Sequence, residues 1–101
     1  MKLHIPEITT IGGHEIQIVY DEKVDEYADC FGLYDSSTDK ITLNPGVANA
    51  QLEETYIHEL IEACNKLFDL KMDHQTIQTL GVGMHQALTT GRGVKWKKVK
   101  N

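Results

Sequence analysis

A histidine and two glutamates lie close together in one stretch of this sequence: His58 and Glu59 are adjacent, and Glu62 follows three residues later. In a helix, side chains at positions i and i+4 point the same way, about one turn apart. His58 and Glu62 could therefore grip one metal ion, because imidazole nitrogen and carboxylate oxygen both bind zinc at about 2.0–2.2 Å. Glu59 would project about 100° away, a direction suited to a general base toward an attacking water.

A catalytic zinc ion needs a third protein ligand and an open coordination position. His74 and His85 are the candidates for that ligand, and both fall in the second of two expected helices. They would lie about 16 Å apart along a helix axis, so one ion could not bind both. An antiparallel helix pair would bring His74 toward the C-terminal half of the first helix and His85 toward its N-terminal end. Spacing alone leaves the choice open.

The same residues also fit a simpler interpretation. Glu54, His58 and Glu62 recur every four residues, which is what the solvated face of a helix looks like when neighbouring charges make weak pairs. A His-Glu-x-x-Glu pattern without further information is a weak signal for a metal. On the residues alone, the solvated face is therefore favoured over the metal site.

Two helices are expected to position these side chains. Apolar residues at helical spacing predict a first helix over residues 49–69, with Asn49 as a plausible N-cap. Asp73 can cap a second helix over residues 74–89. Two glycines inside that helix, Gly81 and Gly83, each cost about 1 kcal/mol relative to alanine. They indicate either close packing against a neighbouring backbone or a kink.

A small antiparallel sheet of three to four strands is expected before the helices, which makes the fold class α+β. The segments with a strand pattern are residues 3–8, 14–20, 30–35 and 40–43. Gly32 inside a strand indicates either an ordinary bulge, which is the likelier interpretation from composition, or an edge strand beside a cleft. In the second case Tyr34 would line the same cleft.

The length of 101 residues predicts a single domain, 1–101, in which residues 91–101 form a basic tail or an edge strand. Residues 1–91 carry five Lys or Arg and fifteen Asp or Glu, a net charge of −10. Such an acidic body argues against a general nucleic-acid surface. The basic tail with Trp96 could still bind nucleic acid, but a charged edge strand or a frayed end is favoured.

Neither a secretory signal nor an apolar run of about 20 residues is seen, so we expect a cytoplasmic protein without a membrane partner. Cys30 and Cys64 are distant in sequence and outside any Cys-x-x-Cys motif, and we expect both to be reduced thiols.

The order of elements resembles the small zincin-like metallopeptidase family found in phage genomes and prophage regions. That family has a Gly-bearing strand, a strand of the Ile-Thr-Leu type, and a helix of the form Thr-Leu-Leu-His-Glu-hydrophobic-hydrophobic-His-Ala. The resemblance covers roughly residues 14–90 and is most specific around the first helix. The matching segments here are Gly32-Leu33-Tyr34-Asp35, Lys40-Ile41-Thr42-Leu43 and Thr55-Tyr56-Ile57-His58-Glu59-Leu60-Ile61-Glu62-Ala63.

The resemblance implies a zinc-dependent hydrolase that acts on a peptide or protein substrate, with Glu59 as the general base. The family has a second His where this chain has Glu62, and a Glu where this chain has His74. The donor types are thus retained while two positions exchange identity. A solvated helix face gives no reason for such an exchange, so the resemblance favours zinc held by His58, Glu62 and His74, and it favours His74 over His85.

Two alternatives stay open beside this hypothesis. The first is a zincin-like protein that binds a metal or a partner but cleaves nothing. The second is an accessory protein that binds nucleic acid through the cations between Arg92 and Lys100.

Overall fold

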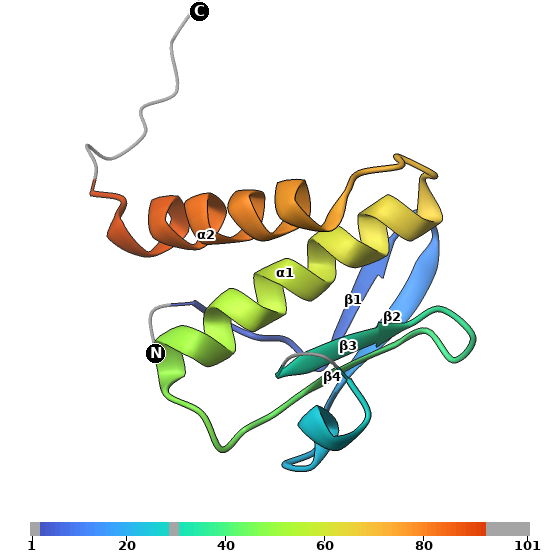
Figure 1. Cartoon of the computed structure of the whole chain (residues 1–101), viewed down its shortest axis with the longest axis horizontal. Helices are drawn as coiled ribbons and strands as arrows, with labels where there is room; N and C mark the ends of the chain where they lie inside the picture. The colour runs from blue at the N-terminus through green and yellow to red at the C-terminus, as the bar shows by residue number, and fades with distance from the viewer. Residues whose placement is uncertain (1–2, 29–30, 93–101) are drawn as a thin grey trace, which may run out of the picture.

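A computed structural model describes residues 3–28 and 31–92 of the chain. Its elements follow the expected order of a sheet and then two packed helices, which confirms the α+β class (Figure 1). They are β1 (Ile8–Ile11), β2 (His14–Tyr20), the 3-10 helix η1 (Val24–Glu26), β3 (Gly32–Asp35), β4 (Lys40–Leu43), α1 (Asn49–Leu67) and α2 (His74–Thr90). The final strand considered for the basic tail, together with Trp96 and Cys30, lies outside the described residues.

The sheet has the strand order β1-β2-β4-β3 and is mixed rather than antiparallel throughout. β1 and β2 form one antiparallel hairpin, and β3 and β4 form another. β2 and β4, however, pair in parallel, with Ile18 opposite Ile41. The expectation of a purely antiparallel sheet was therefore wrong. The chain between β2 and β3 is long enough to pass through η1 and leave β3 at the outer edge, which places β4 parallel to β2.

The first strand begins later than the pattern indicated. Residues 3–7 are not a strand, and β1 starts only at Ile8, after Pro6, which has no N–H to donate to a ladder. Gly12 and Gly13 then join β1 to β2 with φ of 56° and 80°. Positive φ at both central residues is what a tight type I′ hairpin turn requires, and glycine adopts it without strain.

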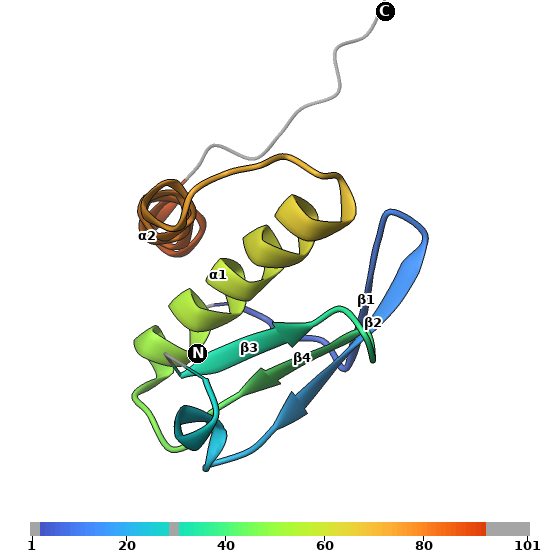
Figure 2. The ribbon, with the colours of Figure 1, turned by 45° about the vertical axis from the view of Figure 1, so that its right-hand side comes forward.

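The molecule has three layers, with α1 lying on the sheet and α2 lying on α1 away from the sheet (Figure 2). The core fills the space between the sheet and α1. Its buried members are Ile16, Ile18, Ile41 and Leu43 from the strands and Leu52, Tyr56 and Ala63 from α1. Ile77 is the large apolar side chain that α2 buries. Within the described residues, neither helix is both long and apolar enough to cross a membrane.

The two helices begin differently. Asp73 caps α2 as expected, because its Oδ1 accepts a hydrogen bond of 2.7 Å from the Thr76 N–H. The N-cap of α1 is Ala48 rather than Asn49, and no side chain bonds the first turn there. The cap assignment to Asn49 was therefore wrong by one residue: its backbone already lies within the helix. Cys64 on α1 is a free thiol, as expected.

Two glycines mark where backbone segments approach α1. A Cβ on Gly32 would lie 2.6 Å from Thr55 Cγ2 and 3.2 Å from Glu59 Cγ, while β3 keeps an unbroken register with β4. Gly32 therefore permits a close approach to α1 and is not a bulge. On the other side, a Cβ on Gly81 would lie 3.6 Å from the Cα of His58, whereas one on Gly83 would meet nothing within 4 Å. Close packing thus accounts for Gly81 and not for Gly83.

These environments predict opposite effects of the same substitution. Gly32→Ala should lower the free energy of unfolding by about 1–3 kcal/mol, because β3 must shift away from α1 to admit the methyl group. Gly83→Ala is the matched control, and it should raise that free energy by up to about 1 kcal/mol through its better helix propensity. Urea denaturation followed by circular dichroism measures both. Equal stability of Gly32→Ala and the wild type would contradict the packing described at β3.

Candidate functional site

His58 and His74 lie side by side, although they come from different helices. Their ring centroids are 5.7 Å apart, and the ring planes are inclined by 63°. Two imidazole rings that bind one tetrahedral zinc ion at about 2 Å have centroids about 5 Å apart. The structure therefore brings the two imidazole rings to nearly the centroid separation that a shared ion requires.

The turn between the helices fixes where His74 lies. Asn65 on α1 bonds both backbone groups of Met72: its Oδ1 accepts from the Met72 N–H at 2.9 Å, and its Nδ2 donates to the Met72 carbonyl at 3.3 Å. Asp69 and Lys71 in this turn adopt left-handed backbone with φ of 51° and 59°. Together with the Asp73 cap, these contacts start α2 at His74, beside the C-terminal half of α1.

The surroundings of His58 lower its pKa below the ordinary value of 6.5. Burial is the main cause, since it disfavours the charged ring. The carboxylate of Glu62 opposes this shift, the His74 ring adds to it, and Glu54 opposes it again. His58 is therefore neutral at neutral pH, which is the form that can donate a lone pair to a metal.

A groove of about 400 Å³ opens beside the two histidines. This volume falls within the range of about 300–1,000 Å³ that is usual for ligand sites. Both helices contribute to its walls, and Phe31, which precedes β3, closes one side. The lining residues are Phe31, Gln51, Glu54, Thr55, His58, His74, Gln78, Gly81 and Val82.

Glu62 does not share this groove. It is half-buried one turn beyond His58 and lines a second depression of about 540 Å³, together with Tyr34 and Asn65. The carboxylate that lines the groove with the histidines is Glu54. Accordingly, no three His, Cys, Asp or Glu side chains of residues 3–28 and 31–92 are already arranged to hold a metal ion.

Glu59 points toward the sheet rather than into the groove. Only 3% of this residue is exposed, and its Oε1 accepts a hydrogen bond of 2.9 Å from the Tyr34 N–H on β3. Its helical offset from His58 therefore directs the carboxylate to the edge strand. Gly32 lies at the same contact between β3 and α1, and Tyr34 borders the depression that contains Glu62.

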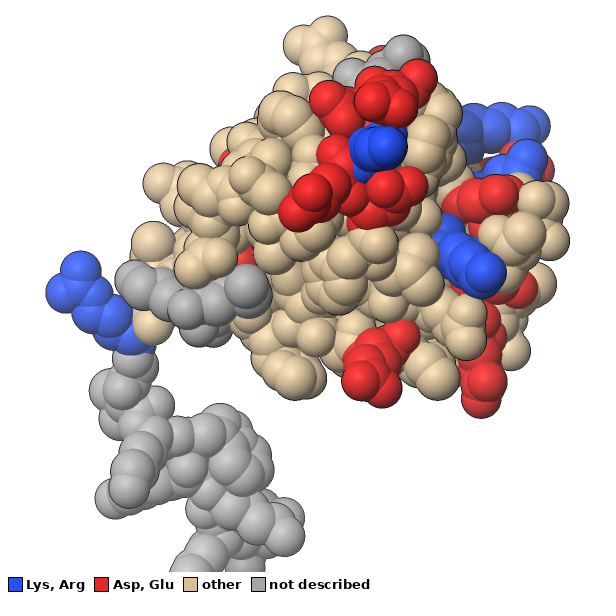
Figure 3. Space-filling view, turned by 90° about the horizontal axis from the view of Figure 1, so that it is seen from below, with Lys and Arg blue, Asp and Glu red and all other residues tan. Residues whose placement is uncertain are grey.

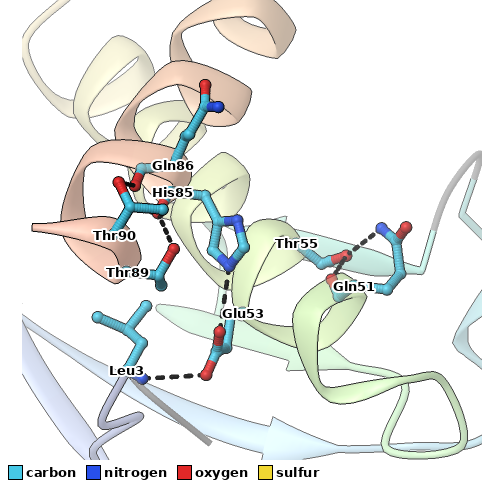
Figure 4. A network of polar contacts seen from close by, with 8 residues as sticks. All are labelled: Leu3, Gln51, Glu53, Thr55, His85, Gln86, Thr89 and Thr90. Carbon is cyan, nitrogen blue, oxygen red and sulfur yellow. Dashed lines mark hydrogen bonds and ion pairs between the residues drawn. The ribbon is translucent and has the colours of Figure 1, made fainter.

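His85 lies near the C-terminal end of α2 and belongs to a separate network of polar contacts (Figure 4). Its Nε2 lies 3.1 Å from Glu53 Oε1, and Glu53 Oε2 accepts a hydrogen bond of 3.0 Å from the Leu3 N–H. Glu53 is only 4% exposed, so this carboxylate joins the N-terminal segment, α1 and α2 in the interior. Sequence reasoning did not identify Glu53 as buried. The available signal was its position four residues before Ile57, on the apolar stripe of α1.

Comparisons of the chain with family models, with curated proteins and with solved structures found no match.

The Glu53 network predicts a stability effect. Glu53→Ala should lower the free energy of unfolding by about 1–3 kcal/mol, because it leaves the Leu3 N–H and the His85 ring without their buried acceptor. Glu53→Gln, which keeps one acceptor oxygen, should cost less. Thermal unfolding of the two variants tests the order, and an equal loss from both would contradict it.

The pKa of His58 offers a second test, by NMR titration of the ring protons in chelator-treated protein. We expect His58 to titrate below 6.5. Glu62→Gln should lower the pKa of His58 further, because it removes a carboxylate that raises this pKa. His74→Gln should raise the pKa of His58, because it removes a ring that lowers it. Glu22→Gln, a remote carboxylate, is the control.

The same shift predicts how stability depends on pH. The unfolded chain binds more protons than the folded protein between the lowered pKa of His58 and 6.5. The contribution of His58 to the free energy of unfolding is therefore present above pH 6.5 and is lost as the pH falls through the folded value. A His58 pKa at or above 6.5 would contradict its burial.

Proposed function

We propose that this protein is a zinc-binding hydrolase of the zincin-like type that acts on a peptide-like amide, with His58, His74 and Glu62 as the zinc ligands. The observation that carries the proposal is the 5.7 Å separation of the two imidazole rings, which come from different helices and lie beside a groove. If His58 belonged only to a solvated helix face, there would be no reason for His74 of the next helix to lie beside it.

Glu62 is the proposed third ligand because of its effect on His58. It lies at i+4 from His58, and among the charges that act on the His58 ring its effect is the largest. Its side chain is only half-buried, so rotation about its bonds can bring the carboxylate to the imidazole pair. Two nitrogens and one carboxylate are the ligand types of a catalytic zinc site with an open fourth position.

Zinc held there would supply a Lewis acid that polarises a carbonyl oxygen and acidifies a water. The chain's own residues have the remaining tasks. Glu59 would take a proton from the attacking water once its carboxylate turns from the Tyr34 N–H toward the groove. The groove between α1 and α2 would hold the substrate so that its scissile amide lies beside the metal ligands.

The alternative without catalysis keeps the same ligands but gives Glu59 only a structural role, that of fastening β3 to α1. Its hydrogen bond to Tyr34 and its burial fit this structural role without any movement of the side chain. Glu59→Gln separates the two: a hydrolase loses turnover and keeps its zinc, whereas a binding protein keeps every measurable function.

Nucleic-acid binding has less support. The described residues carry five Lys or Arg and fourteen Asp or Glu, a net charge of −9. Figure 3 shows groups of carboxylates on the face near η1, with few cations between them. A surface of this kind repels phosphate. Binding to DNA or RNA that weakens steeply with salt would revive this alternative through the basic tail, of which residues 93–101 lie outside the described part of the chain.

Zinc binding is the decisive measurement, by competition with a chelating dye. We expect about one zinc ion per wild-type chain and no tight site in His58→Ala or His74→Ala. Glu62→Gln should weaken binding by at least about 10-fold. His14→Ala is the matched control, because His14 is exposed and contacts Asp39 at 3.0 Å, away from the site.

Two outcomes would change the proposal. Sub-stoichiometric zinc in the wild type under metal-replete conditions would overturn it. A larger loss of affinity in Glu54→Gln than in Glu62→Gln would transfer the third ligand to Glu54.

A further inference from the structure

We infer that the groove beside His58 and His74 binds the basic side chain of a peptide, with an arginine guanidinium at the end formed by Glu54 and Gln51. The inference deepens the proposed function, on which it depends for the peptide substrate, by naming the side chain that the groove selects. Its physical basis is the set of hydrogen-bonding groups that line the groove.

The charge of the groove has one sign. Among its described lining residues Glu54 is the one carboxylate, and Lys and Arg are absent. Within the described part of the chain, no hydrogen bond or ion pair engages the side-chain carboxylate of Glu54. A carboxylate that has no internal partner and faces a groove attracts a cation and repels an anionic ligand.

Gln51 and Thr55, next to Glu54 in the groove wall, are hydrogen-bonded to each other. Gln51 Nε2 donates to Thr55 Oγ1 at 3.1 Å, and Thr55 Oγ1 donates to the Gln51 backbone carbonyl at 2.8 Å. Figure 4 shows that the oxygen of the Gln51 side-chain amide points away from Thr55. Two acceptor groups at this end of the groove, the Gln51 amide oxygen and the Glu54 carboxylate, thus remain for a ligand that brings N–H donors.

Two separate acceptors favour arginine over lysine. A guanidinium presents five N–H donors in a planar fork, whereas an ammonium is a compact point charge. The apolar wall suits the rest of the side chain, because Phe31 is 39% exposed and Val82 is 45% exposed at the groove. An aliphatic stem would cover both, and the Phe31 ring can also attract the cation.

The zinc ion and the guanidinium would be bound on opposite sides of His58 along α1. Glu54 lies one turn before His58 on α1, and Glu62 lies one turn after it. Side chains four residues apart on a helix are separated by about 5–6 Å. An ion held toward Glu62 and a guanidinium held at Glu54 can therefore be bound at the same time, with the backbone of the substrate between them.

The test compares two ligands of nearly the same shape. Nα-acetyl-arginine methylamide and its citrulline analogue are titrated into the full chain, and binding is followed by amide chemical shifts. Chelator-treated protein tests the groove without zinc. We expect the arginine ligand to bind about 10-fold tighter, since a hydrogen bond to a charged donor is stronger than one to the neutral citrulline. Glu54→Gln should abolish this preference, and Glu22→Gln, an exposed carboxylate elsewhere, should leave it intact.

Gln51→Leu is the second variant, and it should reduce the preference without changing the net charge. Equal affinity of wild type for the two ligands, or a preference retained in Glu54→Gln, would overturn the inference. Its failure is distinguishable from failure of the proposed function. If the protein takes up zinc but shows no arginine preference, only the inferred arginine specificity is contradicted. If it prefers arginine but takes up no zinc, only the proposed hydrolase function is contradicted.

Discussion

The close approach of other backbone segments to both faces of α1 is the constraint on which this structure depends. Gly32 brings β3 against Thr55 and Glu59 on one face, and Gly81 brings α2 against the backbone of His58 on the other. A side chain at Gly32 would push the edge strand away, and a large one at Gly81 would separate the helices. Because α1 carries the His-Glu pair, both approaches determine what surrounds those side chains. The groove, the histidine pair and the buried carboxylates all follow from this packing.

The four glutamates of α1 have different roles according to the face on which they lie. Glu53 and Glu59 are buried, and each accepts a hydrogen bond from a backbone N–H of another segment, that of Leu3 or of Tyr34. Burial of a carboxylate is costly unless it gains such partners, so these two fasten the N-terminal segment and β3 to the helix. Glu54 and Glu62 lie one turn before and after His58 and are less buried, so their charges are available to a ligand.

Local periodicity could predict most of the elements and little of their pairing. β2, β4 and the start of α1 follow from alternation and from helical spacing, because those patterns report which face of an element is buried. The parallel pairing of β2 with β4 could not be predicted in this way, since alternation does not identify a strand's neighbour. Helical spacing likewise gave the direction in which Glu59 and Glu62 leave α1. It could not show that Glu59 would accept a hydrogen bond from β3, or that Glu62 would line a separate depression with Tyr34.

The proposed zinc ligands come from two helices, so zinc binding would also affect how the helices pack, which two ligands on one helix would not do. His58 belongs to α1 and His74 is the first residue of α2, so an ion shared by them would join the two helices. α2 packs chiefly on α1, buries only Ile77 among its large apolar side chains, and leaves Leu80, Met84 and Leu88 exposed. It is therefore held less firmly than α1, which is packed on both faces. A ligand that binds only the docked arrangement stabilises that arrangement by mass action. Metal binding, the docking of α2 on α1 and the shape of the groove would in this way be coupled to one another.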